Sequence, residues 1–218
     1  MSDPPLECDP CPARWGPEED RVNSMCNSQA AYSALGALPM GWVGEIVDAE
    51  LVASPRPAPP QARAAFMLGV ELGERLEPRR GGSGRWCLLR APELRLGPDV
   101  LVPDLAGWRR ERFEQAPRAD EPFLRIAPDW VCEVLAPSTA ALDRTRKLPA
   151  YARAGVSHVW LVDPVARTLE HLQRVKRGWL LAGLHEGDAL VRAEPFAATP
   201  LELGALWMPS EGHLELVR

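Results

Sequence analysis

The clearest hydrophobic pattern in the chain lies between residues 129 and 164. Trp130 to Leu135 is a short apolar run rich in strand-forming residues, as expected for a buried strand. His158 to Val162 is a second run of this kind, and a short helical segment ending at Gly155 separates the two. A strand, a helix and a strand in this order predict a parallel pair joined by a right-handed crossover.

Further elements are predicted on both sides of this unit. Apolar residues at helical spacing predict an amphipathic helix from Gln61 to Leu76, and a shorter helix is expected over residues 28–38. Strands are expected at residues 42–47, 50–53, 85–96 (as one strand or two), within 100–108, and at 168–175, 179–184 and 190–191. We expect an exposed loop at 109–127 and a Leu-rich tail that packs on the sheet. The order predicts an α/β fold, with a mixed central sheet flanked by helices and a β-rich C-terminal extension.

Length and composition limit the possible classes of protein. A chain of 218 residues fits one domain, and residues 1–24, which show no periodicity, predict a disordered leader before a domain over 25–218. The sequence has neither an apolar run of roughly 18 residues nor a secretory signal, so no membrane association is expected. Five cysteines without a regular framework favour reduced thiols and a cytoplasmic location. Cys8 and Cys11 form a CxxC pair, but only Cys26 lies nearby and zinc needs four ligands.

The charge is distributed unevenly along the chain. The net charge of -5 argues weakly against nucleic acid, but residues 1–24 account for -4 of it. Residues 141–177 carry eight bases and three acids, so a local basic face can still attract phosphate groups. Of the 25 basic residues only Lys147 and Lys176 are lysines. A lysine in a chain that otherwise uses arginine suggests chemistry that needs a compact, tunable ammonium group.

Three residues together suggest a reaction. Glu133 interrupts an apolar strand, where a carboxylate is rare unless it is paired or binds a metal. Asp104 follows Pro103 near a predicted strand, and two carboxylates on neighbouring strands can hold a hard divalent cation. An ammonium group near that cation, from Lys147, can position a water molecule for attack on phosphorus. These groups would suffice for phosphodiester hydrolysis.

A family resemblance rests on these residues and their surroundings. The matching segments are Gly44–Val52, Pro103-Asp104, Glu133–Leu135, Pro137–Thr139, Asp143, Lys147, Tyr151–Val156 and Val159–Asp163. They resemble the Uma-two family, restriction-endonuclease-like proteins within the PD-(D/E)xK nuclease superfamily. The resemblance covers roughly Met25 to Trp207 and implies a restriction-endonuclease-like fold. It also implies a nucleic-acid substrate, DNA being expected, and Mg²⁺ or Mn²⁺ as the cofactor.

The resemblance assigns four residues. Asp104 and Glu133 would be metal ligands, Lys147 the catalytic lysine and Glu45 a supporting acid. The chain departs from the pattern at Leu135, where the motif has a lysine, so that Lys147 on the following helix would supply this group instead. Ala49 and Ala136 also replace the usual Gly and Ser, which affects turn geometry but no catalytic group.

Each assignment has a structural alternative. Pro-Asp pairs are common in turns, and Asp99 and Asp129 also follow proline. Asp129 would share a strand face with Glu133 and is the second choice of ligand. Glu133 could instead pair with Arg144 or Arg146.

Residues around the predicted helix have alternatives too. Glu45 could simply face solvent at a strand start. Asp143 is favoured as an early-turn acid, and Tyr151 as a core residue. Pro149 suits the first turn of a helix beginning near Leu148, with Lys147 at its entrance.

Three functions are consistent with this fold: a Mg²⁺-dependent endonuclease, an inactive nuclease fold that binds nucleic acid or protein, and a structural oligomer. The many Trp and Leu residues could build a dimer face, so a homodimer is expected. The endonuclease is the preferred interpretation.

Overall fold

The computed structural model describes residues 30–76, 84–115 and 121–209. Residues 1–24, which contain the CxxC pair, lie outside these ranges. The disordered leader and the domain boundary at residue 25 therefore remain predictions. Residues 30–36 are helical, within the helix expected over 28–38. In the ranges described, no helix combines the length and apolar character needed to cross a membrane.

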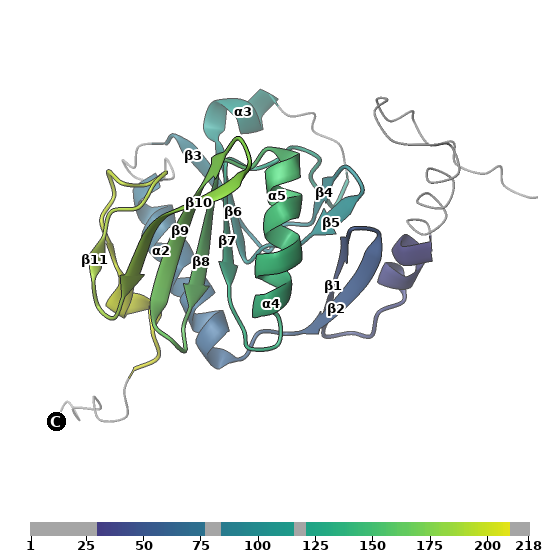
Figure 1. Ribbon diagram of the computed structural model, residues 1–218, viewed down its shortest axis with the longest axis horizontal. Helices are drawn as coiled ribbons and strands as arrows, with labels where there is room; N and C mark the ends of the chain where they lie inside the picture. Colours follow the sequence, from purple (N-terminus) through teal and green to yellow (C-terminus); the bar gives the residue numbers. More distant parts are fainter. Residues whose placement is uncertain (1–29, 77–83, 116–120, 210–218) are drawn as a thin grey trace, which may run out of the picture.

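A six-stranded sheet forms the centre of the structure (Figure 1). Its strand order is β10-β9-β8-β7-β6-β3. The strands are β3 (Trp86–Arg90), β6 (Leu105–Arg109), β7 (Trp130–Val134), β8 (His158–Asp163), β9 (Thr168–Val175) and β10 (Gly178–Glu186). Strands β7 and β8 are parallel, as the apolar pattern predicted, and the other neighbouring strands are antiparallel. The predicted mixed sheet is therefore confirmed.

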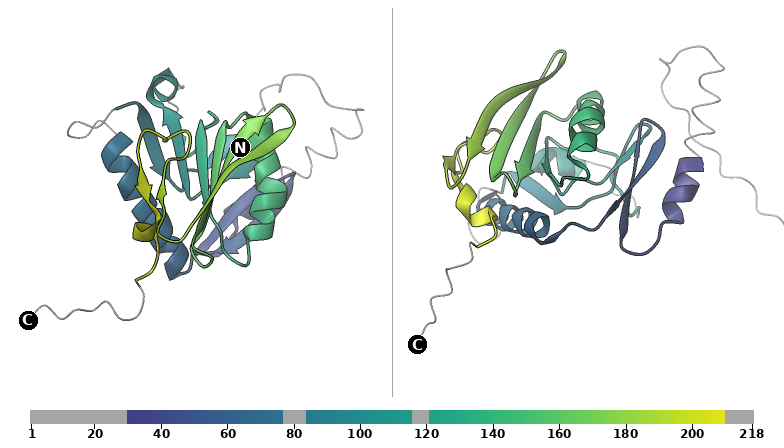
Figure 2. Two further views of the ribbon diagram at one scale, coloured as in Figure 1. Left: turned by 60° about the vertical axis from the view of Figure 1, so that its left-hand side comes forward. Right: turned by 60° about the horizontal axis from the view of Figure 1, so that its bottom comes forward.

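Helices cover both faces of this sheet (Figure 2). Side chains along β7 alternate, so that Trp130 and Cys132 pack in one cluster with helix α2 (Pro59–Leu76). Val131 packs in the opposite cluster with helix α5 (Leu148–Ala154). Because Glu133 is two residues after Val131, its carboxylate lies on the α5 face of the sheet, next to this apolar cluster.

The helix before β8 begins earlier than predicted. Helix α4 (Ala140–Leu142), the π-helical segment η1 (Asp143–Lys147) and α5 follow one another without a break. The Leu148 amide donates to the Asp143 carbonyl five residues back, and this wider turn accommodates Pro149, which lacks an amide hydrogen. The prediction that Lys147 stands at a helix entrance is therefore wrong, because Lys147 lies inside the helix. The predicted cap at Gly155 is confirmed, with φ of 93°.

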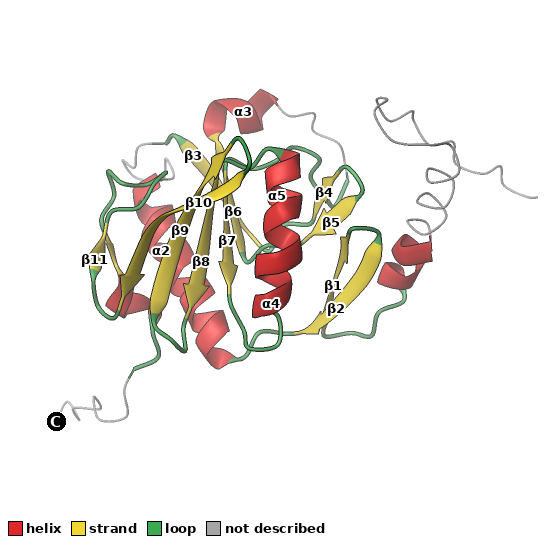
Figure 3. Cartoon of the chain, in the orientation of Figure 1, coloured by secondary structure: helices red, strands yellow, loops and turns green. Residues whose placement is uncertain are grey.

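A smaller antiparallel sheet of order β2-β1-β5-β4 lies beside the helix (Figure 3). It contains β1 (Trp42–Val47), β2 (Glu50–Pro55), β4 (Leu94–Leu96) and β5 (Asp99–Leu101). Residues 85–96 thus contribute β3 to the central sheet and β4 to the smaller sheet. Residues 100–108 are likewise divided between β5 in the smaller sheet and β6 in the central sheet. The chain passes from β5 to β6 through Asp104, which places this residue where the two sheets meet.

The segment expected to be an exposed loop, residues 109–127, is partly structured. It contains helix α3 (Arg110–Gln115), and Leu124 forms an isolated bridge with Leu94. Phe113 and Ile126 pack against the buried cluster on the α5 face. These apolar side chains explain why the charged, proline-bearing segment does not remain fully exposed.

The C-terminal extension is β-rich, as predicted, but it does not simply widen the central sheet. Strand β11 (Leu190–Val191) pairs with β12 (Leu201–Glu202) in a separate two-stranded sheet. The 3₁₀ segment η2 (Leu203–Leu206) then contacts α2, and Leu201 and Leu206 enter the α2-side core. Residues 201–207 of the Leu-rich tail therefore contact α2 and share the core that α2 forms with the central sheet.

The predicted hairpin of β1 and β2 turns at Asp48 and Ala49, with φ of 51° and 63°. Positive φ at both central residues is the geometry of a type I′ turn, which strongly favours glycine at the second position. Ala49 adopts it although a left-handed conformation costs an L-residue roughly 1–2 kcal/mol.

Replacing Ala49 with glycine should therefore raise the free energy of unfolding by about 1 kcal/mol, measured by urea denaturation. The matched control is Ala53→Gly on strand β2, where the backbone is extended and the change should lower stability by about 0.5–1 kcal/mol. Equal effects at the two positions would contradict the strain assigned to Ala49.

Candidate active site

A pocket of about 780 Å³ lies between the two sheets, the start of α2 and the α4–α5 helix. Besides Arg56 and Arg90, its lining contains five ionisable residues that come from four parts of the fold: Glu45 on β1, Asp104 between β5 and β6, Glu133 on β7, and Asp143 and Lys147 on η1. All four residues assigned from the sequence, Glu45, Asp104, Glu133 and Lys147, therefore line one pocket.

Lys147 is at the centre of this group. Its side chain is only 3% exposed, and its Nζ atom lies 2.9 Å from Glu45 Oε1 and 2.9 Å from Glu133 Oε1. Asp143 Oδ1 is 3.5 Å away, one helical turn earlier. Burial by itself would lower the pKa of Lys147, but the Glu133 and Glu45 carboxylates outweigh it and raise this pKa well above its usual value. Lys147 is therefore a charged ammonium group at neutral pH.

Glu133 is held by two donors. The buried Tyr151 hydroxyl donates a hydrogen bond to Glu133 Oε1, the oxygen that also contacts Lys147. Burial raises the pKa of Glu133 well above its usual range, and Lys147 opposes this effect. Burial likewise raises the pKa of Tyr151, so its hydroxyl stays neutral and can donate.

The predicted alternative, a pair of Glu133 with Arg144 or Arg146, is wrong. Arg144 pairs with Glu170, and Arg146 pairs with Asp48 and Glu50.

Backbone amides position Asp104 and Glu45. Asp104 Oδ2 accepts the Val134 amide at 2.7 Å, which ties Asp104 to the strand that carries Glu133. Glu45 Oε1 accepts the Val102 amide at 2.7 Å, and Glu45 is 6% exposed, so the interpretation that it faces solvent is wrong. Burial raises the pKa of Asp104 to about 6, although the Val134 amide and Lys147 both act to lower it.

The donor set fits a hard divalent cation. No group of three or more His, Cys, Asp or Glu side chains in the described ranges is arranged to hold a metal ion, but Mg²⁺ needs only one or two protein carboxylates because it keeps several waters. The contacts described above use one oxygen each of Asp104 and Glu133, so a second oxygen remains on each carboxylate. The pocket lining carries four acids against three basic residues, Lys147, Arg56 and Arg90, and a cation would offset the remaining negative charge.

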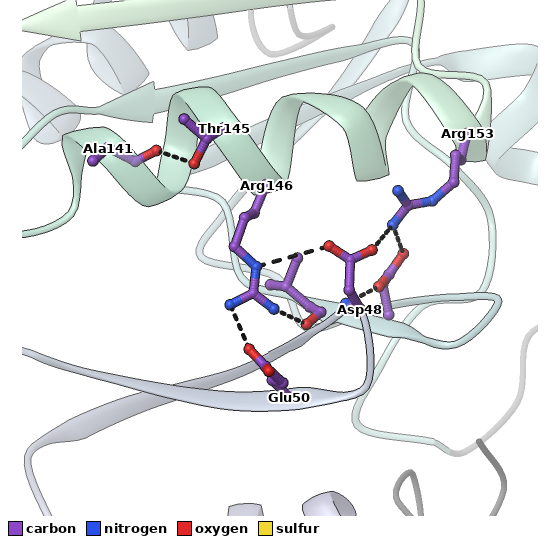
Figure 4. Close-up of polar contacts among 8 residues, drawn as sticks. Asp48, Glu50, Ala141, Thr145, Arg146 and Arg153 are labelled. Carbon is purple, nitrogen blue, oxygen red and sulfur yellow. Dashed lines mark hydrogen bonds and ion pairs between the residues drawn. The ribbon is translucent and has the colours of Figure 1, made fainter. Parts of the chain in front are cut away.

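An ion-pair network outside the pocket fixes the hairpin against the helix (Figure 4). Asp48 accepts from Arg153 at 2.7 Å, and Arg146 pairs with Glu50 at 2.8 Å and donates to the Val47 carbonyl. Arg153 also pairs with Asp99 at 3.0 Å. Glu45 lies on β1 just before the hairpin turn, and Lys147 directly follows Arg146. The network therefore fixes the position of Glu45 relative to Lys147.

Two aspartates considered from the sequence lie elsewhere. Asp129 accepts hydrogen bonds from the Arg109 amide and the Arg112 side chain, at the opposite end of β7 from Glu133. Asp99 accepts the Asp48 amide and pairs with Arg153. Neither residue lines the pocket.

Two residues near Lys147 were assigned other roles from the sequence. Asp143 is not only an early-turn acid: it is buried beside Lys147, and burial raises its pKa. Tyr151 is a core residue as predicted, but it also bonds Glu133. Residues 143, 147 and 151 are four apart, a spacing that places them on one helix face. This signal was missed because the helix was predicted to begin at Leu148.

The fold and pocket together define a class of protein. A mixed central sheet with a helix on each face, and a pocket where strand acids meet a helix lysine, belong to the restriction-endonuclease-like fold. A crystal structure of a putative nuclease belonging to DUF820 from Anabaena variabilis is similar to this chain, with a TM-score of 0.64 and 20% sequence identity. The match covers 80% of this chain and 95% of that chain. No match is found among curated proteins.

The family is shown by a match of the sequence itself. The family model Uma2, described as "Putative restriction endonuclease", matches residues 32–204. The chain therefore belongs to the Uma2 family, as the resemblance of the sequence motifs predicted.

The pKa of Asp104 gives a pH-dependent prediction. Its folded-state pKa of about 6 lies above the ordinary value of 3.8, so the folded protein binds a proton more tightly than the unfolded chain. The free energy of unfolding should therefore fall as pH rises from 4 to 7, by about 2 kcal/mol from this group alone. Asp104→Asn should remove that part of the decrease, measured by urea denaturation in EDTA. Parallel pH profiles for the two proteins would contradict the raised pKa.

Proposed function

We propose that this protein is a divalent-metal-dependent endonuclease that hydrolyses phosphodiester bonds of nucleic acid, with DNA as the expected substrate. The observation that carries this proposal is the pocket in which Asp104 and Glu133, from separate β-segments, lie with the buried ammonium group of Lys147. Membership of the Uma2 family, described as "Putative restriction endonuclease", supports the reaction class.

In this proposal Asp104 and Glu133 would hold Mg²⁺ or Mn²⁺ through the carboxylate oxygens that their described contacts do not use. When bound, the cation would polarise a phosphate oxygen, activate a water molecule and offset developing negative charge. Hydrolysis forms one oxygen–phosphorus bond and breaks another, while a proton leaves the attacking water and another reaches the leaving oxygen.

Lys147 would act through its charge. Because the neighbouring carboxylates keep it protonated, its ammonium group would stabilise negative charge near the phosphate rather than accept a proton. Glu45 supports this role, since it holds the lysine at 2.9 Å while it is itself fixed by the Val102 amide. Tyr151 orients Glu133 from the same helix.

The cytoplasmic location and the homodimer remain predictions from the sequence. Absorbance-detected sedimentation of the purified chain would measure the oligomeric state directly.

Activity tests the proposal directly. Purified protein with Mg²⁺ or Mn²⁺ should cleave plasmid or oligonucleotide DNA, and Glu133→Gln should lower the rate at least about 100-fold while preserving side-chain shape. Lys147→Met should have a similar effect, whereas Lys176→Met, which changes the chain's other lysine in an exposed turn, should not.

Folding must be monitored alongside activity, because removing Lys147 leaves buried acids without their cation and can cost about 3–5 kcal/mol. The isosteric Glu133→Gln variant avoids this problem. Metal-containing protein that folds but cleaves neither DNA nor RNA would overturn the nuclease proposal. Salt-sensitive binding without cleavage would instead identify the inactive binding module.

Metal binding can be measured apart from catalysis. Isothermal titration with Mn²⁺ should detect a site in the wild-type protein that Asp104→Asn and Glu133→Gln each weaken at least about tenfold. Because Asp104 has a pKa of about 6, protons compete with the cation, and affinity should fall between pH 7 and pH 5. Equal affinity in wild-type protein and in both variants would place the metal elsewhere.

A further inference from the structure

The mouth of the pocket differs in chemistry from its floor. The floor is acidic and recessed, since Lys147 and Glu133 are each 3% exposed. A phosphodiester group must therefore enter the pocket before it can meet them. The mouth instead carries an indole ring and two guanidinium groups, from Trp42, Arg56 and Arg90.

Trp42 is a large aromatic side chain left half exposed, at 49%, on the lining of the pocket. Its backbone is fixed, because its amide donates to the Pro39 carbonyl and the residue pairs with Pro55 across the hairpin. By contrast, Trp86, Trp108, Trp130, Trp160 and Trp207 are all buried in the core. An exposed, positioned indole beside a polar site provides a face on which a flat ring can stack.

Arg56 and Arg90 are both exposed on the pocket lining. Neither forms an ion pair or a side-chain hydrogen bond with any residue in the ranges described, whereas arginines elsewhere on the surface, such as Arg144 and Arg167, pair with acids. Arg56 follows β2 in the small sheet, and Arg90 ends β3 in the central sheet. Two guanidinium groups from different sheets, both without a side-chain partner among the described residues, can therefore contact phosphates that flank the acidic floor.

Taken together, the geometry points to a nucleic acid with unpaired nucleotides as the ligand of this pocket: we propose that a base stacks on Trp42 while Arg56 and Arg90 bind neighbouring phosphates. This inference rests on the proposed nucleic-acid substrate and specifies its form. Bases inside a duplex are stacked on one another and cannot reach a side chain unless they leave the helix. A single strand exposes both its bases and its phosphates, which is the combination that an aromatic and basic groove binds.

The test is binding measured without cleavage. Fluorescence anisotropy in EDTA would compare a labelled 16-nucleotide single strand with a duplex of the same sequence. The single strand should bind at least about tenfold more tightly, and Trp42→Ala should weaken its binding about 5- to 100-fold without changing duplex binding. Phe66→Ala removes an aromatic ring that is 61% exposed on α2, outside the pocket lining, and is the matched control.

Salt dependence separates the arginines from the tryptophan. Arg56→Gln and Arg90→Gln should each reduce the slope of log affinity against log salt by about 0.7 for a single strand. Trp42→Ala should leave that slope unchanged, as should Arg177→Gln in the exposed β9–β10 turn.

The outcomes distinguish this inference from the proposed function. If duplex and single strand bind equally and Trp42→Ala changes neither, the inference is wrong, and metal-dependent cleavage can still be present. If Trp42 and the arginines govern single-strand binding but no metal supports cleavage, the inference holds and the nuclease proposal fails.

Discussion

A single buried ammonium group is the interaction on which the candidate site depends. The Lys147 Nζ atom lies 2.9, 2.9 and 3.5 Å from carboxylate oxygens of Glu45, Glu133 and Asp143. A strand of each sheet and the helix therefore meet at one atom. The planar guanidinium of arginine is larger and presents its donors in a fixed fork, so it cannot replace a compact ammonium here. This explains why a chain with 25 basic residues keeps a lysine at this position.

The same arrangement is electrostatically unfavourable, because several acids lie close together in a buried site. One ammonium group does not neutralise four neighbouring acids. Burial raises the pKa values of Asp104, Glu133 and Asp143, and the neighbouring acids raise them further. Such clusters are typical of functional sites, where chemistry rather than stability determines the residues. The fold offsets the strain around the pocket: the Val134 and Val102 amides fix two of the acids, and exposed ion pairs at Asp48 hold the hairpin in place. Each exposed pair contributes little alone, but together they set the position of Glu45.

The parts of the structure with strict periodicity were predictable, and those that depend on tertiary context were not. Continuous apolar runs identified β7 and β8 and their parallel pairing, and helical spacing identified α2. The position of Asp104 at a junction between two sheets has no local signal, because a Pro-Asp pair looks the same in any turn. Pro149 misled the placement of the helix start, since proline usually marks a first turn, whereas here a π-helical segment accommodates it. That one error concealed the shared helix face of Asp143, Lys147 and Tyr151.

The position of the lysine also explains a departure from the sequence motif. Two residues beyond Glu133, where the motif has a lysine, stands Leu135, which is 3% exposed and packs with Leu148 and Tyr151. A charged side chain there would enter the apolar layer between β7 and the helix, at a large desolvation cost. Lys147, on the helix, contacts Glu133 Oε1 without placing a charge at the position of Leu135. The pocket thus needs an ammonium group at one position in space, and a chain can supply it from strand β7 or from the helix. A motif defined by residue spacing along one strand therefore identifies the site less reliably than the arrangement of its charged groups.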